Sequence, residues 1–269
     1  MKNIPFFVPS AKIIKAKVRQ LVFAARPKCP RCGKDSSVRR SERRYRCRKC
    51  RRPFSLTSHT WLSGMKISWP KLWTLLWCFC ASYQPEQAAQ QAKVSLVTVR
   101  HWYSLFRRHL PQRERQLEFL VCADEGYFGK QQTGNQRIAA GAIEPQTNEV
   151  RLAIVPDTEQ ATLEGFLWQY ISPAETMVYT DGHPSYQDIE FMGYAHDTDN
   201  HSKHHLKNTV PIERVWSFAK WHMRRMYHHL WAKHYAEFLR EIEWRFAQPE
   251  TFSNPLSFLT ITLNPVPTD

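Results

Sequence analysis

The chain has 269 residues, 42% of them hydrophobic, which is enough for one large domain or two to three small ones with a packed core. No apolar run approaches about eighteen residues, which excludes a membrane span. No signal peptide is recognisable, so we expect a cytoplasmic protein. Its seven cysteines are then expected to be reduced thiols or metal ligands. The net charge of +14 divides into +16 for residues 1–60, +6 for residues 61–115 and −8 for residues 116–269, so the first two segments suit phosphate backbones and the third does not.

Residues 11–25 carry apolar side chains at positions 13, 14, 18, 21 and 22, with basic residues between them. This spacing predicts a short amphipathic basic helix. Such a helix suits either packing on the segment that follows or contact with DNA, and the pattern leaves both interpretations open.

Four cysteines follow in the pattern C-x2-C-x14-C-x2-C, namely Cys29, Cys32, Cys47 and Cys50. Two such pairs provide the four thiolates of a tetrahedral zinc ion. A segment this small buries too little apolar surface to fold alone, so a structural Zn²⁺ would supply its folding free energy. The alternatives are disulfides or a redox dithiol, but paired cysteines in a chain without an export signal favour zinc. The remaining cysteines lie in apolar runs typical of core thiols.

The predicted zinc ribbon is strongly basic. Tyr45 and Phe54 are expected to form its small core. Arginines cluster around the second cysteine pair, and we expect them to contact DNA phosphates. These arginines are Arg43, Arg44, Arg46, Arg48, Arg51 and Arg52.

Three helices are predicted over residues 61–115. Trp69-Pro70 opens an apolar helix, because proline suits the first helical turn. Residues 86–94 and 96–108 predict two more helices, with Ser95 as the cap of the second. Small alanines in the first of these and polar and aromatic residues in the other favour a DNA-binding helix-turn-helix; the alternative is an ordinary three-helix linker. The predicted DNA contacts are Thr98, Arg100, His101, Arg107 and Arg108, and the basic extension after them carries Arg113 and Arg115.

From residue 116 the pattern changes to strands. Residues 117–123, 138–143 and 150–155 predict an antiparallel meander, and residues 158–171 predict a helix. A fourth, buried strand over 176–180 precedes a short polar region, a long helix over 210–229 and a last helix over about 233–246. This order is that of an α/β, RNase H-like fold, in which the first and fourth strands lie side by side at the centre of the sheet.

Three acids fall at related positions of this fold: Asp124 follows the first strand, Asp181 ends the fourth, and Glu213 opens the long helix. Singly, each has an ordinary explanation as a turn residue or a helix N-terminal charge. Together they would raise one another's pKa, and a divalent cation such as Mg²⁺ or Mn²⁺ relieves that repulsion. The three acids therefore predict one metal site for cutting and joining DNA. The neighbouring Glu125 is expected to shape the loop rather than to bind metal.

Six motifs carry a resemblance to a known family: CPRCG, YRCRKCRRPFS, ADEGYFGK, YTDGHPSY, IERVWSFAK and YHHLWAKHYAEFLREIEWRF. They resemble the DDE transposases of bacterial insertion sequences, in the zinc-ribbon group related to Merlin-type DNA transposons. The resemblance covers about residues 28–247, and ADEGYFGK together with IERVWSFAK makes it specific. One departure is that Asn208 lies two residues further upstream of Ile-Glu than the family usually has it.

The resemblance implies a transposase with a retroviral-integrase-like catalytic domain, acting on double-stranded DNA as a homo-oligomer in the bacterial nucleoid. Asp124, Asp181 and Glu213 match the family's acidic positions, and Lys220 matches its trailing lysine. Seven residues separate Lys220 from Glu213, which is two helical turns, so Lys220 can reach a phosphate near the metals. The alternative for Lys220 is a solvated helix lysine.

Nine of the twelve histidines fall between residues 183 and 234, including those of 196–205 and 228–234. Their spacing fits DNA contacts and structural hydrogen bonds better than a second zinc site.

The predicted domains are a basic segment and zinc ribbon (1–60), a helix-turn-helix domain (61–115), an RNase H-like domain (116–250) and a C-terminal tail (251–269). The predicted activity is that of a DNA transposase, which binds terminal inverted repeats, cleaves the ends and joins them to target DNA. The alternatives are a non-catalytic DNA-binding regulator and a metal-dependent nuclease without joining activity.

Overall fold

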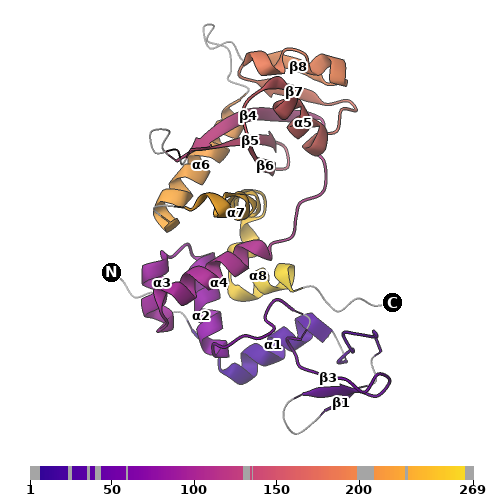
Figure 1. The fold of residues 1–269 in the computed structure, drawn as a ribbon, viewed down its shortest axis with the longest axis vertical. Helices are drawn as coiled ribbons and strands as arrows, with labels where there is room; N and C mark the ends of the chain where they lie inside the picture. The colour runs from indigo at the N-terminus through magenta and orange to yellow at the C-terminus, as the bar shows by residue number, and fades with distance from the viewer. Residues whose placement is uncertain are drawn as a thin grey trace. The chain divides into compact units, whose positions relative to one another are not determined.

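The computed structural model describes residues 7–23, 26–34, 37–39, 44–58, 60–129, 134, 136–198, 209–227 and 230–263. The chain divides into two compact units, which are unit 1 (Met1–Pro111 with Glu250–Asp269) and unit 2 (Gln112–Pro249). Figure 1 traces the elements of each. Arg43, Asn208 and the histidines of 201–205 and 228–229 lie outside the described residues. Among the residues described, no helix has both the length and the hydrophobicity that crossing a membrane requires.

Unit 1 opens with a helix that is built into the ribbon. The elements are α1 (Ala11–Phe23) and the antiparallel strands β1 (Ser37–Arg39), β2 (Tyr45–Cys47) and β3 (Pro53–Phe54). Phe23, the last residue of α1, packs edge-on against Tyr45 and Phe54 with ring centroids 5.6 and 6.3 Å away. Tyr45 and Phe54 stack on each other at 5.3 Å. The ribbon core is therefore an aromatic cluster completed from the preceding helix.

The rest of unit 1 is helical. Its helices are α2 (Trp69–Cys80), α3 (Pro85–Ala92), α4 (Leu96–Arg108) and α8 (Pro255–Thr262). Phe79, Phe106 and Phe258 meet in the core with ring centroids 5.3 to 5.8 Å apart. Residues 255–262, within the predicted C-terminal tail, thus form a helix whose Phe258 is buried in this unit. The helices around the three-residue turn 93–95 occur where the pattern predicts them, while their role as a DNA-binding motif stays a prediction.

Unit 2 is a five-stranded sheet in the order β6-β5-β4-β7-β8 with helices on its faces. β4 pairs with β5 and β5 with β6 antiparallel, whereas β4 and β7, and β7 and β8, are parallel. This topology confirms the predicted RNase H-like fold. The elements are β4 (Leu120–Phe128), β5 (Arg137–Glu144), β6 (Glu149–Val155), α5 (Gln160–Tyr170), β7 (Met177–Thr180), β8 (Ala195–Thr198), α6 (Val210–Tyr227) and α7 (Tyr235–Ala247).

The two faces of the sheet are covered by different helices. Side chains alternate along a strand, so Val121 and Ala123 of β4 join the core with α5, whereas Cys122 and Phe128 join the core with α6 and α7. Asp124 has the same parity as Cys122 and therefore belongs to the face that α6 covers. Glu125 belongs to the opposite face.

The outer edge of the sheet is capped by a buried carboxyl group. The amide of Leu152 in the edge strand β6 donates to Oε1 of Glu243 in α7 at 2.7 Å. This hydrogen bond occupies a backbone donor of the kind that makes exposed edge strands prone to pairing. Burial raises the pKa of Glu243 from 4.5 to about 7.

The raised pKa of Glu243 predicts a pH-dependent stability. Between pH 4.5 and about 7 the folded state holds a proton that the unfolded state has lost, so the free energy of unfolding falls as the pH rises through that window. The fall attributable to this group is about 3 kcal/mol at most, because each pKa unit corresponds to about 1.4 kcal/mol. Glu243→Gln removes the ionisation and keeps an acceptor for Leu152. Urea titrations at about pH 5 and pH 8 should show a smaller fall for the variant than for the wild type; parallel falls would contradict the prediction.

Candidate metal and nucleic-acid sites

Asp124 and Asp181 lie level with each other on neighbouring parallel strands. β4 runs from Leu120 to Phe128, through the acids that the sequence pattern places after the strand. The pairing register joins Leu120 to Met177 and Cys122 to Tyr179. Continuing this register sets Asp124 opposite Asp181, the first residue beyond β7. Neighbouring strands are about 4.8 Å apart, so the two carboxyl groups share one small region at the carboxyl end of β7.

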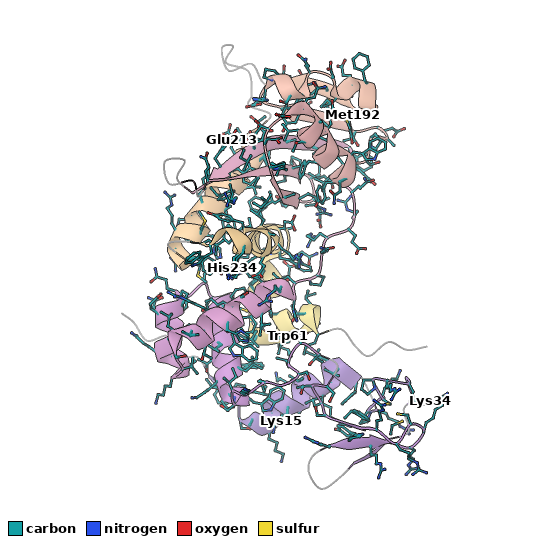
Figure 2. The ribbon with its side chains drawn as sticks, viewed as in Figure 1. Lys15, Lys34, Trp61, Met192, Glu213 and His234 are labelled. Carbon is teal, nitrogen blue, oxygen red and sulfur yellow. The ribbon has the colours of Figure 1, made fainter. Side chains whose placement is uncertain are left out.

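Glu213 approaches the same face of the sheet from helix α6. It lies in the first turn of α6 and is exposed, and Figure 2 shows it at the start of that helix, beside the sheet. The inward side of α6 packs on β4 and β5 through Ile212, Val215 and Trp216. The three predicted acids are therefore brought to one side of the sheet by two strands and a helix.

The pKa of Asp124 is affected by the other two acids. Burial raises the pKa of Asp124 above its usual value, and the negative charges of Asp181 and Glu213 add to the rise. The backbone N–H of Glu125 and the indole of Trp216 act in the opposite direction by donating to the carboxylate. A half-buried carboxylate under repulsion from two others carries the kind of charge that a hard divalent cation such as Mg²⁺ neutralises. The oxygens of the three acids are not gathered as closely as the sulfurs of the four cysteines, which form the one group of three or more potential ligands within 4.8 Å of one another among the described residues.

Glu125 has a different environment from its neighbour. Its Oε1 accepts a hydrogen bond from the hydroxyl of Tyr186, a residue buried in the core on the α5 side of the sheet. Burial, with the charges of Asp124 and Asp181, raises the pKa of Glu125. The alternation of side chains along β4 thus separates two adjacent acids by the thickness of the sheet.

Trp216 is a member of this site that the sequence interpretation missed. It is 4% exposed, and its Nε1 donates to Asp124 Oδ2 at 3.1 Å. It lies three residues after Glu213 and four before Lys220, on the same side of α6. Lys220 itself is exposed, two turns from Glu213. The signal for Trp216 was its spacing from Glu213 within the IERVWS motif.

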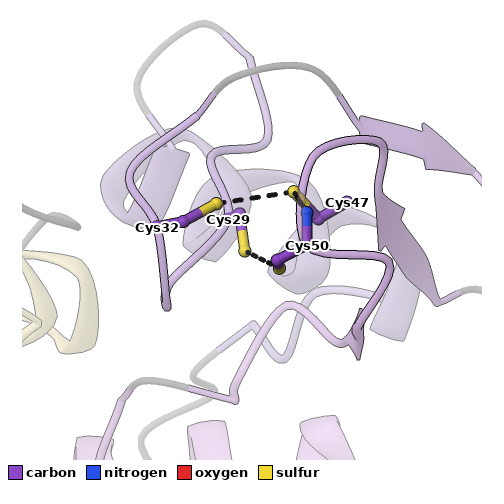
Figure 3. Close-up of side chains that lie close together, drawn as sticks. All are labelled: Cys29, Cys32, Cys47 and Cys50. Carbon is purple, nitrogen blue, oxygen red and sulfur yellow. Dashed lines mark hydrogen bonds between the residues drawn. The ribbon is translucent and has the colours of Figure 1, made fainter.

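The four predicted zinc ligands come together in unit 1. Their Sγ atoms all lie within 4.8 Å of one another, with Cys29 and Cys50 at 3.6 Å and Cys32 and Cys47 also at 3.6 Å (Figure 3). A disulfide needs about 2.05 Å, whereas four sulfurs at about 2.3 Å from a zinc ion are separated by just under 4 Å. The cluster therefore fits a structural zinc ion. The amide of Cys50 donates to Cys47 and lowers the pKa of that thiol to about 7, which favours the thiolate that binds metal, whereas burial raises the pKa of the Cys29 thiol to about 11.

Most of the predicted DNA contacts are on the surface of unit 1. Five ribbon arginines, together with Arg100, His101 and Arg108 of α4, are exposed; the five are Arg44, Arg46, Arg48, Arg51 and Arg52. Thr98 is half-buried, and its amide donates to Ser95 in the helix cap at 3.2 Å. Arg100 lies 3.6 Å from Glu86 of α3.

Arg107 requires a correction. It is 4% exposed, so its guanidinium is not presented to DNA as the sequence pattern predicts. Its position explains the difference, because it stands one residue after the buried Phe106 and shares the inward side of α4 with Tyr103.

The basic extension after α4 has partners in unit 2. Arg113 donates through Nε to Glu149 at 2.9 Å, and Arg115 donates to both oxygens of Glu144 at 2.9 and 3.0 Å. Buried Arg151 also pairs with Glu149, at 3.0 Å. Arg113 and Arg115 therefore anchor the start of unit 2 to the edge strand β6 and to its neighbour β5.

Two family models match the chain. The ISXO2-like transposase domain matches residues 120–247, and the transposase zinc-ribbon domain matches residues 12–53. An uncharacterized transposase-like protein of Haemophilus influenzae is 30% identical over 105 residues, which are 38% of this chain and 84% of that protein.

Solved structures of retroviral integrases are also similar. The integrase catalytic core domain of HTLV-2 in complex with magnesium aligns over 51% of this chain and 90% of its own, at 12% identity and a TM-score of 0.35. The simian T-cell lymphotropic virus intasome with the PP2A regulatory subunit B56 gamma aligns over 64% of this chain and 67% of its own, at 10% identity and a TM-score of 0.37.

Proposed function

Because this chain belongs to the ISXO2-like transposase family, we propose that it cleaves the ends of its own DNA element and joins them to target DNA by metal-dependent phosphoryl transfer. The observation that carries the proposal is the convergence of Asp124, Asp181 and Glu213 on one side of the sheet, where the last two raise the pKa of the first. Such a cluster is costly without a cation and suited to holding one.

In this proposal the three acids hold Mg²⁺ or Mn²⁺. When bound, two such ions supply activation of the attacking oxygen and stabilisation of the leaving oxygen. Lys220, exposed on the same helix as Glu213, binds a phosphate of the DNA end and keeps the scissile bond beside the carboxylates. No covalent bond between protein and DNA forms, because water attacks the phosphate first and the released 3′-hydroxyl attacks second.

In this proposal unit 1 binds the DNA ends. The exposed arginines of the ribbon bind phosphates, and Arg100 and His101 of α4 contact the groove in a helix-turn-helix arrangement. This division follows the charge, since residues 1–115 are strongly basic and residues 116–269 are net acidic. Cutting two ends in one event would engage at least two copies on double-stranded DNA of the bacterial nucleoid.

The test is a cleavage and joining assay with the full chain and duplexes from either side of its own gene. With Mg²⁺ present, we expect nicking at the inverted repeats and a slower-migrating product in which a cut end is joined to unrelated DNA. The matched control has the same duplexes with scrambled repeats. Cleavage without joining would make the protein a nuclease, and binding without cleavage would make it a regulator; either result would contradict the proposal.

A further inference from the structure

The indole of Trp216 lies in a slot on the sheet that glycine leaves open. A Cβ built at Gly126 of β4 would lie 2.8 Å from Cδ2 of the indole, and one at Gly141 of β5 would lie 2.6 Å from Cη2. Both distances are shorter than side-chain carbons tolerate. Gly141 is the direct pairing partner of Asp124, and Gly126 is two residues beyond it on the same face. The slot is therefore a gap of two missing side chains beside the acid.

The same indole is bonded to the acid and carried by the helix of the third acid. Its Nε1 donates to Asp124 Oδ2 at 3.1 Å. Phe128, further along β4, closes the slot with its ring edge-on to the indole at 5.9 Å. Trp216 lies one turn after Glu213. How deeply its ring enters the slot therefore determines the distance between the first turn of α6 and the sheet.

We propose that Trp216 is a positioning residue of the metal site: its N–H fixes the orientation of the Asp124 carboxylate, and its ring seats α6 so that Glu213 meets the same cation. This inference rests on the proposed function of the three acids. The slot explains why two glycines occur on one face of a central sheet, where they would otherwise weaken the strands.

A side chain that orients a metal-binding carboxylate affects metal affinity even though it does not touch the metal. A donor that orients a ligating carboxylate typically contributes 10- to 100-fold in metal affinity. Loss of the N–H should therefore weaken metal binding.

The experiment measures Mn²⁺ binding to the zinc-loaded full chain by titration calorimetry, without DNA. Trp216→Phe keeps an aromatic ring and removes the N–H. Benzothienylalanine incorporated in place of Trp216 keeps the bicyclic shape and replaces the N–H with sulfur, so it tests the hydrogen bond even where Trp216→Phe perturbs folding. Both are expected to weaken Mn²⁺ binding about 10- to 100-fold. The melting temperature of the benzothienylalanine protein should stay near that of the wild type.

A second variant tests the slot while leaving the indole unchanged. Gly126→Ala adds one methyl group where the ring lies, and the three atoms nearest to its Cβ all belong to Trp216, so it should displace the indole and weaken Mn²⁺ binding although every carboxylate remains. Gly165→Ala in α5 is the matched control, because a Cβ there meets nothing within 4 Å. Trp168→Phe, at a 59% exposed position of α5, is the control for losing an indole. Neither control should change Mn²⁺ affinity.

The outcomes separate this inference from the proposed function. If Asp124→Asn abolishes Mn²⁺ binding but benzothienylalanine at position 216 binds Mn²⁺ as the wild type does, the positioning role of Trp216 is overturned and the metal site stands. If the Asp124→Asn variant binds Mn²⁺ with the same affinity as the wild type, the metal site itself is overturned, and the inference with it.

Discussion

Replacing Asp124 with asparagine is expected to lower the rate of DNA end cleavage by at least about 10³-fold while leaving end binding nearly unchanged. The change removes one negative charge from the cluster of Asp124, Asp181 and Glu213, and the metal-dependent stabilisation at stake is several kcal/mol, at about 1.4 kcal/mol for each factor of ten. Asparagine keeps the size of the side chain and an oxygen that can accept from Trp216 Nε1, so the fold should persist. Single-turnover cleavage of a labelled end and a filter-binding titration measure the two quantities.

Glu125→Gln is the matched control, since it makes the same chemical change one residue further along the strand. Glu125 faces the core on the α5 side and is bonded to Tyr186, so its carboxylate is not placed to bind the proposed metal even though its charge interacts with those of Asp124 and Asp181. The variant should retain cleavage within about tenfold of the wild type, because a glutamine oxygen can still accept from Tyr186. Equal losses in the two variants would contradict the assignment of the acids to opposite faces.

The second large effect is expected at the ribbon. Cys47→Ser should remove bound zinc and unfold the ribbon, because structural zinc contributes an apparent 10–16 kcal/mol, roughly, to small domains of this kind. The exposed arginines would lose their fixed arrangement, and affinity for the DNA ends should fall by about 10²-fold or more. Zinc content per chain and end binding at fixed salt concentration are the measurements.

Cys78→Ala is the control for this experiment. Cys78 is buried in α2, and burial raises the pKa of its thiol to about 12, so it has the character of a core side chain rather than a ligand. Its replacement should leave one zinc ion per chain. Zinc retained by the Cys47→Ser variant, or lost from the Cys78→Ala variant, would contradict the assignment of the ligands.

The parts of the fold that the sequence predicts are those where local pattern and tertiary position agree. The strand before Asp124, the buried strand before Asp181 and the helix after Glu213 all have strong periodicity, and their order alone specifies the topology. β8 was missed because Ala195–Thr198 is a polar, largely exposed edge strand, without the apolar alternation that identifies a strand. Helix α8 was missed because a short apolar segment near the chain end has no partner visible in the sequence.

The missed parts of the site depend on pairing between distant residues. Nothing local marks Gly141 as the neighbour of Asp124, since the pairing that joins β4 to β5 fixes it. The spacing of Trp216 from Glu213 places both on one side of the helix, but only the two glycines beneath the indole show where on the sheet it packs. The buried position of Arg107 likewise depends on which side of α4 faces inward, a choice that a run of two arginines leaves open.

The contact of Phe23 with Tyr45 and Phe54 has a consequence for how such proteins diversify. The last residue of α1 is part of the ribbon core. The segment between the cysteines is therefore not a unit that can be exchanged between related proteins by itself. A chimera that swaps end recognition between relatives would have to carry residues 11–54 as one piece. Grafting residues 29–50 alone would pair a foreign ribbon with the wrong aromatic anchor.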